Sequence, residues 1–434
     1  MKPTGLLIAV AVLAVLGGVT WWSNKKQASA KTDTATKILS IPADGVQEVT
    51  VKNPQQTIDL KRDNGKWRMT QPQPLPADQD ATTTLVSALS SLNADSVVDE
   101  KATDLTPYGL KTPTVEVHVV EKGGKNDNLL IGDETPKGDA SYAKLANDPR
   151  VFTIASYVKN NIAKSPNDLR DKRLMNFDSD KLTRVDLDAA GKPEVEFGKN
   201  GQNEWQILKP RPSRADGGTV DTLVSNLKDV RMDLSEDPDK AEKAFSSATK
   251  TASATVTDSS GNQSIELRKD KDNNYYAKST AVAGVYKVSA DFGKNLDKSL
   301  NDFRNKKLFE FGFSDPSKIE LKGVTYVKSG DKWMSGAKTM DNTTVQNLID
   351  KLRDLSAMTF DEKGGGDQVF ETTVTSNMGK RVERVTISKQ GNQYFAKRDD
   401  EPGIYGVDAK SVEDLQKAAG DVKEAAPPAA AKKK

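Results

Sequence analysis

The sequence predicts an α+β fold built as three tandem homologous domains, each a mostly antiparallel sheet with a packed helix, after an N-terminal transmembrane helix. Three observations predict it. A hairpin ending in tryptophan recurs at Trp67, Trp205 and Trp333. Each recurrence is followed by apolar residues at helical spacing, and one apolar run stands at the N-terminus. The period of about 130 residues is the size of a domain, whereas solenoid repeats have about 20 to 50 residues.

The first element expected along the chain is a membrane segment. Residues 6–22, LLIAVAVLAVLGGVTWW, are uncharged and flanked by lysines. A helix of about 20 apolar residues crosses a bilayer, and the two tryptophans suit its interface. We expect a retained signal anchor at 1–22 and a polar linker at 23–37. Cleavage after Ala28-Ser29-Ala30 is the alternative.

Each repeat then opens with a hairpin and a helix. The hairpins read IDLKRDNGKWRM, VEFGKNGQNEWQIL and YVKSGDKWMS. An aspartate follows each of them, at Asp78, Asp216 and Asp341. Beyond it, apolar residues at i, i+4 and i+7 share one helix face. These are Leu85, Leu89 and Leu92; Leu223, Leu227 and Val230; and Leu348, Leu352 and Leu355.

Alternating strands and a short closing helix complete each repeat. An aromatic-Ala-Lys motif begins at Tyr142, Tyr276 and Phe395. A second aromatic residue follows ten positions later, at Phe152, Tyr286 and Tyr405. An apolar residue follows after ten more positions, at Ile162, Leu296 and Leu415. Strand period 2 beside helix period 3.6, without βαβ alternation, indicates α+β. We expect domains at 38–177, 178–312 and 313–424, and a disordered low-complexity tail at 425–434.

Composition excludes several classes of function. The 64 Lys and Arg nearly balance the 62 Asp and Glu, so no long-range field favours nucleic acid. Because the chain has no cysteine, it has no thiol nucleophile, disulfide or thiolate zinc site. Because His118 is its single histidine, one chain cannot build a His-based triad or a multi-His metal site. We therefore expect no enzyme, no catalytic or metal-binding residue and no cofactor.

The recurring aspartates and tryptophans each admit two interpretations. The aspartates could form a carboxylate site, but their place ahead of a helix favours N-capping. The tryptophans could stack on a sugar, but their place between a hairpin and an apolar helix face favours a core position.

Three further features have structural interpretations. His118 alternates with valines in VEVHVV and is expected to face solvent rather than a metal. The basic runs at 170–173 and 304–307 could contact an anionic polymer or partner, but they close consecutive domains, which favours linkers or interdomain salt bridges. The cluster Gly364-Gly365-Gly366 lacks a following G-K-[ST], which predicts a flexible turn and no phosphate loop.

The first repeat carries GKWRMTQPQPLPAD, then LTPYGLKTP, then LLIGDETPKGDASYAKL. These motifs resemble the bacterial DUF4340 family of unknown function, over about residues 38–311, with a weaker third copy. The second and third copies lack the Tyr108-Gly109-Leu110 turn, so a family role of that turn could reside only in the first domain. The resemblance implies an envelope protein with an N-terminal membrane segment, often encoded beside gliding-motility-type ABC transporter components. It implies no catalytic residue.

The expected function follows from the architecture and the resemblance. The leading hypothesis is a non-enzymatic, membrane-anchored accessory or scaffold protein, single-pass in the bacterial inner membrane with its bulk in the periplasm, associated with an ABC-type transporter complex. The alternative is an envelope carbohydrate or peptidoglycan binding module that uses the repeated aromatics. A third hypothesis, a carboxylate-based hydrolase, requires clustered acids with a perturbed pKa.

Overall fold

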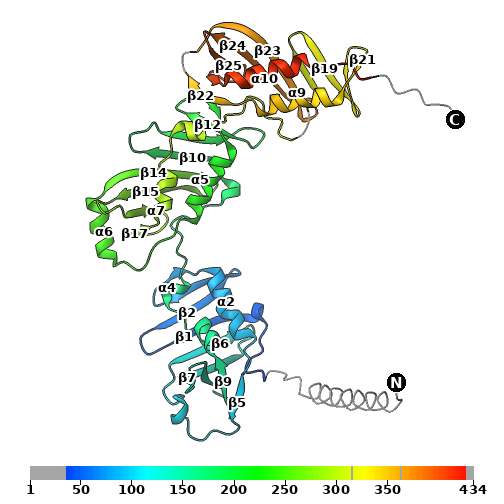
Figure 1. Cartoon of the computed structure of the whole chain (residues 1–434). Coiled ribbons are helices and arrows are strands. Elements are labelled where there is room, and N and C mark those ends of the chain that lie inside the picture. The colour runs from blue at the N-terminus through cyan, green and yellow to red at the C-terminus, as the bar shows by residue number, and fades with distance from the viewer. Residues whose placement is uncertain (1–35, 314–315, 362–363, 427–434) are drawn as a thin grey trace, which may run out of the picture. The chain divides into compact units, whose positions relative to one another are not determined.

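A computed structural model of the chain describes residues 36–313, 316–361 and 364–426, which form three antiparallel sheets with helices packed on them (Figure 1). The chain divides into two compact units, Met1–Lys172 with one sheet and Arg173–Lys434 with two. The predicted α+β class is confirmed. The expected anchor at 1–22, residues 23–35 of the expected linker and residues 427–434 of the expected tail lie outside the described residues. Among the helices described, none is long and apolar enough to cross a membrane.

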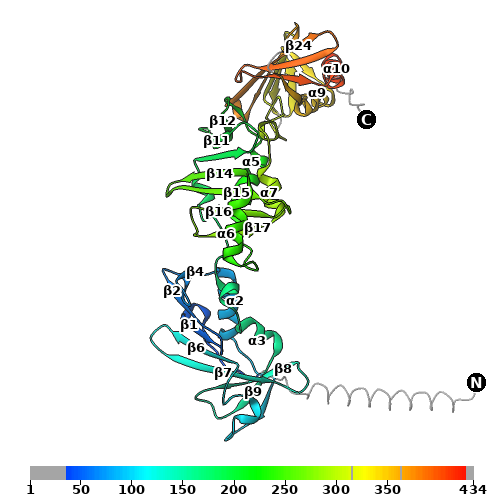
Figure 2. The same ribbon diagram turned by 90° about the vertical axis from the view of Figure 1, so that its left-hand side faces the viewer.

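The first unit contains one nine-stranded sheet with the order β4-β3-β2-β1-β6-β7-β8-β9-β5. Its helices gather on one face of that sheet (Figure 2). The strands are β1 (Val46–Lys52), β2 (Thr57–Asp63), β3 (Lys66–Gln71), β4 (Leu75–Pro76), β5 (Ser96–Asp99), β6 (Val115–Glu121), β7 (Asn126–Glu134), β8 (Ala140–Leu145) and β9 (Val151–Ala155). The helices are η1 (Ala43–Gly45), α2 (Gln79–Ser90), η2 (Thr106–Tyr108), α3 (Ser156–Ile162) and α4 (Pro166–Leu169).

The first sheet of the second unit has the order β13-β12-β11-β10-β14-β15-β16-β17. Its strands are β10 (Arg184–Ala189), β11 (Val195–Lys199), β12 (Trp205–Lys209), β13 (Ser213–Arg214), β14 (Thr249–Asp258), β15 (Gly261–Lys269), β16 (Tyr275–Ser279) and β17 (Val285–Val288). Its helices are η3 (Ser179–Lys181), α5 (Gly217–Asp229), α6 (Pro238–Ser247), α7 (Ala290–Leu296) and α8 (Leu300–Phe303). The sequence patterns did not predict α6, which packs on β16 and β17.

The other sheet of the second unit has the order β21-β20-β19-β18-β23-β24-β25-β26-β22. Its strands are β18 (Lys318–Leu321), β19 (Val324–Ser329), β20 (Lys332–Ser335), β21 (Lys338–Met340), β22 (Ala357–Asp361), β23 (Asp367–Ser376), β24 (Arg381–Gln390), β25 (Gln393–Arg398) and β26 (Ile404–Val407). The helices are α9 (Asn342–Asp354), η4 (Asn377–Gly379) and α10 (Ala409–Gly420), and α9 and α10 pack side by side (Figure 1).

All three sheets share one topology. Four strands run outward to an edge, and a helix then carries the chain back so that a later strand, β6, β14 or β23, pairs beside the first. The first and third sheets add a short strand, β5 or β22, at the far edge. The ten-residue aromatic spacing follows from hairpin register, because the alanine of each aromatic-Ala-Lys motif lies opposite the later aromatic. The pairs are Ala143 with Phe152, Ala277 with Tyr286, and Ala396 with Tyr405.

Three large hydrophobic clusters fill the space between sheets and helices. They draw on residues within 38–169, 174–303 and 308–415. Phe177 and Phe311, which we expected to close the first and second domains, pack in the cores that follow them. The physical reason is a recurring backbone bond: the N–H groups of Leu174 and Leu308 donate to the carbonyls of Val230 and Leu355, at the end of the next helix.

Candidate functional site

The recurring aspartates are helix N-caps, as predicted. The Asp78 carboxylate accepts the N–H groups of Asp80 and Ala81 at 3.0 Å. Asp216 accepts from Thr219 at 2.8 Å, and Asp341 accepts from Thr344 at 3.0 Å. Each begins a different helix on a different sheet, so these carboxylates do not supply the close acidic pair that the hydrolase hypothesis requires.

The recurring tryptophans are core residues, which confirms the packing interpretation. Trp67, Trp205 and Trp333 are 5%, 6% and 3% exposed and belong to the three main clusters. The Trp205 indole Nε1–H donates to the Asp221 carboxylate at 2.8 Å. A buried ring cannot stack on a sugar, so the carbohydrate-binding hypothesis loses the residues on which it rested.

His118 is exposed on β6, as predicted, opposite Thr50 and Asn128 on the neighbouring strands. Within the described residues, no group of three or more His, Asp or Glu side chains could hold a metal ion.

Two motifs of the family resemblance meet in the first unit. The turn at Tyr108 and Gly109 packs on β7 so closely that a Cβ on Gly132 would lie 2.1 Å from the Tyr108 carbonyl oxygen. The Tyr108 hydroxyl donates to the Asp99 carboxylate at 3.2 Å, and its ring meets Tyr142 edge-on at 5.2 Å. The desolvation of this hydroxyl and the Asp99 charge raise the pKa of Tyr108. The turn therefore has a structural role.

The two basic runs are linkers between repeats. Their first residues pair back to the preceding repeat, Arg170 with Ala77 and Arg304 with Ala215. Lys307, at the end of the second run, pairs with Ser356 of the next repeat. The glycine cluster has a steric role, since a Cβ on Gly366 would lie 2.1 Å from the backbone oxygen of Lys389.

The functional candidate that the sequence did not reveal lies inside the second unit, where β13 meets β25 and β26. Arg214 is 8% exposed and its Nε donates to the Glu401 carboxylate at 2.6 Å. Its backbone N–H donates to the same carboxylate at 2.9 Å, and its Nη2 donates to the carbonyl of Lys307 at 2.6 Å. One arginine thus joins two sheets and the linker.

A second buried arginine extends this charge network. Arg398 is 1% exposed, lies 3.2 Å from the Glu383 carboxylate and forms a two-bond contact with Asp400 at 2.9 and 2.7 Å. Burial alone would lower the pKa of Arg398, but the Asp400 hydrogen bond and the nearby carboxylates raise it. Burial raises the pKa of the Glu383 carboxyl. The N–H groups and cations around this carboxyl act in the opposite direction, but burial has the larger effect. Both groups are buried only because they are paired.

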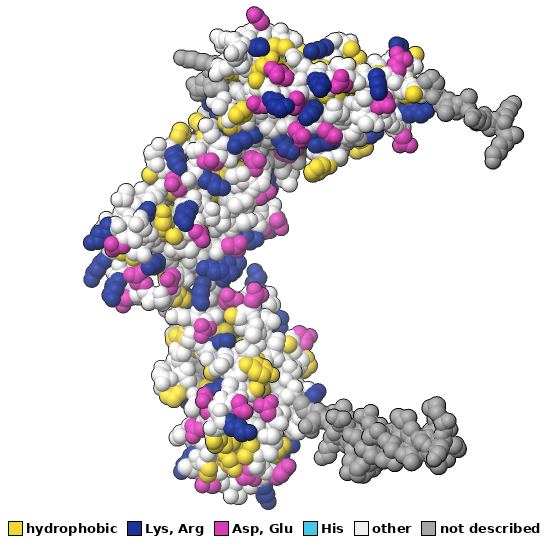
Figure 3. All heavy atoms as spheres, in the orientation of Figure 1, with side chains coloured by type: hydrophobic (Ala, Val, Ile, Leu, Met, Phe, Trp, Pro, Cys, Tyr) yellow, Lys and Arg dark blue, Asp and Glu magenta, His cyan; other side chains and the backbone are white. Residues whose placement is uncertain are grey.

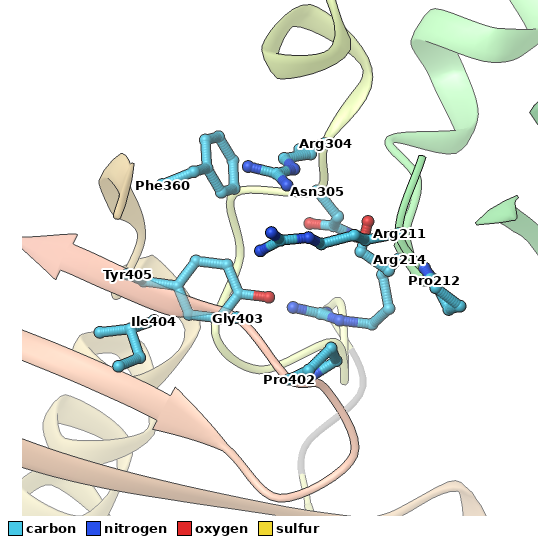
Figure 4. A pocket seen from close by; sticks show the side chains of 11 residues that line it. Arg211, Pro212, Arg214, Arg304, Asn305, Phe360, Pro402, Gly403, Ile404 and Tyr405 are labelled. Carbon is cyan, nitrogen blue, oxygen red and sulfur yellow. The ribbon is translucent and has the colours of Figure 1, made fainter. Parts of the chain in front are cut away.

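Beside this network lies a cavity of about 80 Å³. The side chains of Arg211, Arg214 and Arg304 lie on one side of it, and the rings of Phe360 and Tyr405 lie on the other, with the Tyr405 hydroxyl toward the arginines (Figure 4). The Arg304 guanidinium stacks over Phe360 at 5.0 Å, and Phe360 meets Tyr405 edge-on at 5.7 Å. The lining of the cavity therefore combines guanidinium groups with flat aromatic walls.

The sequence contained one weak signal for this site. The second repeat has PSRAD where the first has PLPAD, so Arg214 replaces Pro76 beside the capping aspartate. Glu401 lies 187 residues away in the chain, in a loop without periodicity, and no spacing rule joins the two. On the face shown in Figure 3, acidic and basic side chains are intermixed, so surface charge does not mark the site either.

The family comparison agrees with the repeat pattern. The model of the domain of unknown function DUF4340 matches residues 67–213 and 205–368, together more than half of the chain. The chain therefore belongs to the DUF4340 family, with two copies recognised in tandem. No curated protein and no solved structure matches it.

Proposed function

We propose that this protein is a non-enzymatic accessory or scaffold protein, anchored in the bacterial inner membrane with its domains in the periplasm, and that it associates with an ABC-type transporter complex. One observation carries the proposal. The residues that recur in all three repeats build the domain: the aspartates cap helices and the tryptophans fill cores. The surfaces that differ between repeats are then the ones that bind a partner, as expected of a binding protein.

The anchored location rests on the sequence. The uncharged run at 6–22 has the length and aromatic boundary of a membrane segment. All three sheets lie on its C-terminal side, so they share one compartment. The absence of cysteine suits an oxidising compartment, because no thiol is available for unwanted cross-linking.

The test is co-purification from the native membrane. The full-length chain, extracted in mild detergent, should bring down an ABC permease or its ATPase, identified by mass spectrometry. The matched control replaces residues 1–22 with a cleavable signal peptide and should release the chain without the transporter. Repeated recovery of the full-length chain alone would contradict the proposal.

A further inference from the structure

We propose that Asn64 is a site of spontaneous covalent modification, where the side-chain amide closes on the Gly65 nitrogen, loses ammonia and is hydrolysed to aspartate and isoaspartate. The site lies at the tip of the hairpin between β2 and β3 in the first unit. This inference goes beyond the proposed accessory role and does not depend on it, because it concerns the chemistry of the chain itself.

The reaction needs only these two residues and water. The Gly65 nitrogen attacks the Asn64 Cγ, a C–N bond forms, and the side-chain nitrogen leaves as ammonia with the proton that the Gly65 nitrogen gives up. Water then opens the cyclic imide at one of its two carbonyls. Opening at the side-chain carbonyl gives aspartate, and opening at the main-chain carbonyl gives isoaspartate. A glycine favours the attack because it has no Cβ beside the nitrogen.

The first argument is the freedom of the reacting groups. Asn64 and Gly65 are both exposed. Within the part of the chain that the structure describes, no hydrogen bond holds the Asn64 amide. A Cβ added to Gly65 would meet no atom within 4 Å, so nothing packs against the turn. The one side-chain contact to the turn, from the Arg62 Nε to the Gly65 carbonyl at 3.5 Å, does not involve either reacting group.

The second argument is the type of turn. Asn64 has φ 49° and Gly65 has φ 80°, which is the pattern of a two-residue type I′ turn. In a type II′ turn the peptide group between the two central residues is turned over, and ψ of the first residue is about −120°. That rotation brings the nitrogen of the second residue to the Cγ of the first. Glycine accepts either sign of φ, so Gly65 can follow the change.

The chain contains a second Asn-Gly pair, Asn200-Gly201, in the loop between β11 and β12. There the asparagine is held: its Oδ1 accepts the N–H groups of Gln202 at 2.9 Å and Glu204 at 3.0 Å. Its Nδ2 donates to the Glu204 carboxylate at 3.1 Å. These bonds must break before the Asn200 Cγ can reach the next nitrogen, and together they should slow the reaction at least about tenfold.

Conversion of Asn64 has a consequence for the first repeat. Isoaspartate adds one atom to the backbone of a turn whose length sets the register of the hairpin. Trp67, on the same hairpin, has its backbone N–H and carbonyl bonded to the Gln79 side chain at 2.8 and 2.9 Å. The modified turn should therefore loosen the attachment of β3 to the helix that begins at Gln79.

The test is incubation of the purified full-length chain in detergent at mildly alkaline pH, both folded and in guanidinium chloride. Proteolytic digestion at mildly acidic pH follows, and peptide mass spectrometry reads the replacement of amide nitrogen by oxygen. In the folded chain Asn64 should convert at least about tenfold faster than Asn200. In the denaturant the hydrogen bonds of Asn200 are lost, and the two rates should agree within about threefold.

The matched control is Asn64→Gly, which keeps a residue that accepts positive φ and removes the amide. After the same incubation its urea unfolding should be unchanged, whereas that of wild type should shift to lower urea concentration. An Asn64 amide that survives in the folded chain but converts in denaturant would overturn the proposal, because the folded turn would then protect it. Equal conversion of Asn64 and Asn200 in the folded chain would also overturn it.

Discussion

Each capping aspartate holds the first turn of its helix through its own side-chain oxygen. Asp216 accepts the Thr219 N–H at 2.8 Å, in the first turn of a helix that carries four buried apolar residues. The cap satisfies a donor that has no partner inside the helix, and the carboxylate charge complements the helix dipole. A residue that recurs at such a place is therefore explained by folding.

Asp216→Ala should lower the free energy of unfolding by about 1 kcal/mol, because the capping bond is lost. Asp216→Asn keeps an acceptor oxygen and should lose only a few tenths. Urea unfolding followed by circular dichroism measures both. A loss of binding to a partner, with unfolding unchanged, would show that this carboxylate serves a site.

Asp258 provides a pH-dependent contribution in the second unit. Its carboxylate accepts from Ser260 and from the Asp178 backbone N–H at 2.9 Å, and these hydrogen bonds lower the pKa of Asp258 from 3.8 to about 2. Because the folded pKa lies below the unfolded one, the stabilisation is present above pH 3.8 and is lost as the pH falls toward about 2.

Asp258→Asn should therefore be less stable than wild type at pH 7, and the difference should shrink as the pH falls from 3.8 to about 2. Unfolding by urea at a series of pH values measures it. Asp272→Asn, in an exposed turn of the same sheet, is the control and should show no comparable trend. A difference that is constant with pH would contradict the assignment.

Close backbone contact determines how elements pack in the first unit. The turn at 105–110 lies on β7, and only a residue without Cβ fits at Gly132, because a Cβ there would lie 2.1 Å from the Tyr108 carbonyl oxygen. Because a backbone atom cannot rotate away, the turn itself would have to move.

Gly132→Ala should lower the free energy of unfolding by about 2 kcal/mol, the middle of the range for overpacking. The matched control is Gly45→Ala, where the new Cβ would meet Pro42 at an ordinary 3.7 Å. Thermal and urea unfolding of both variants measures the effect. Equal stability of the two would mean that the turn yields without cost.

The whole second unit depends on charges buried between its sheets. Arg214 and Glu401 are 8% and 6% exposed, and they come from different sheets. Removing one member of such a pair leaves the other charge buried without its partner, which costs far more than the net value of the pair.

Glu401→Ala should destabilise the second unit by about 3 kcal/mol and split its unfolding into two transitions, because Arg214 loses its buried carboxylate partner and keeps only the more exposed Glu310 carboxylate at 3.3 Å. Differential scanning calorimetry measures the transitions. Glu371→Ala, which removes an exposed acid 3.6 Å from Arg384, should change stability by less than about 1 kcal/mol. A single unchanged transition in Glu401→Ala would show that the network does not couple the two sheets.

The sequence alone determined the repeated domain. Short-range spacing made three features predictable: Trp67 and its counterparts, the capping aspartates and the leucine faces. Strands alternate with period 2, helices repeat with period 3.6, and an N-cap acceptor stands just ahead of the first helical turn. The ten-residue aromatic interval was visible as a pattern, although only the register of Ala143 with Phe152 explained it.

Only the tertiary structure decided which repeat each linker residue joins and where the arginine cavity lies. Phe177 and Phe311 pack in the cores that follow them, because backbone bonds join their segments to the next helix end. Arg214 and Glu401 are 187 residues apart and meet only when two folded sheets dock. Such contacts have no period along the chain, since burial and docking geometry, and not local propensity, bring those charges together.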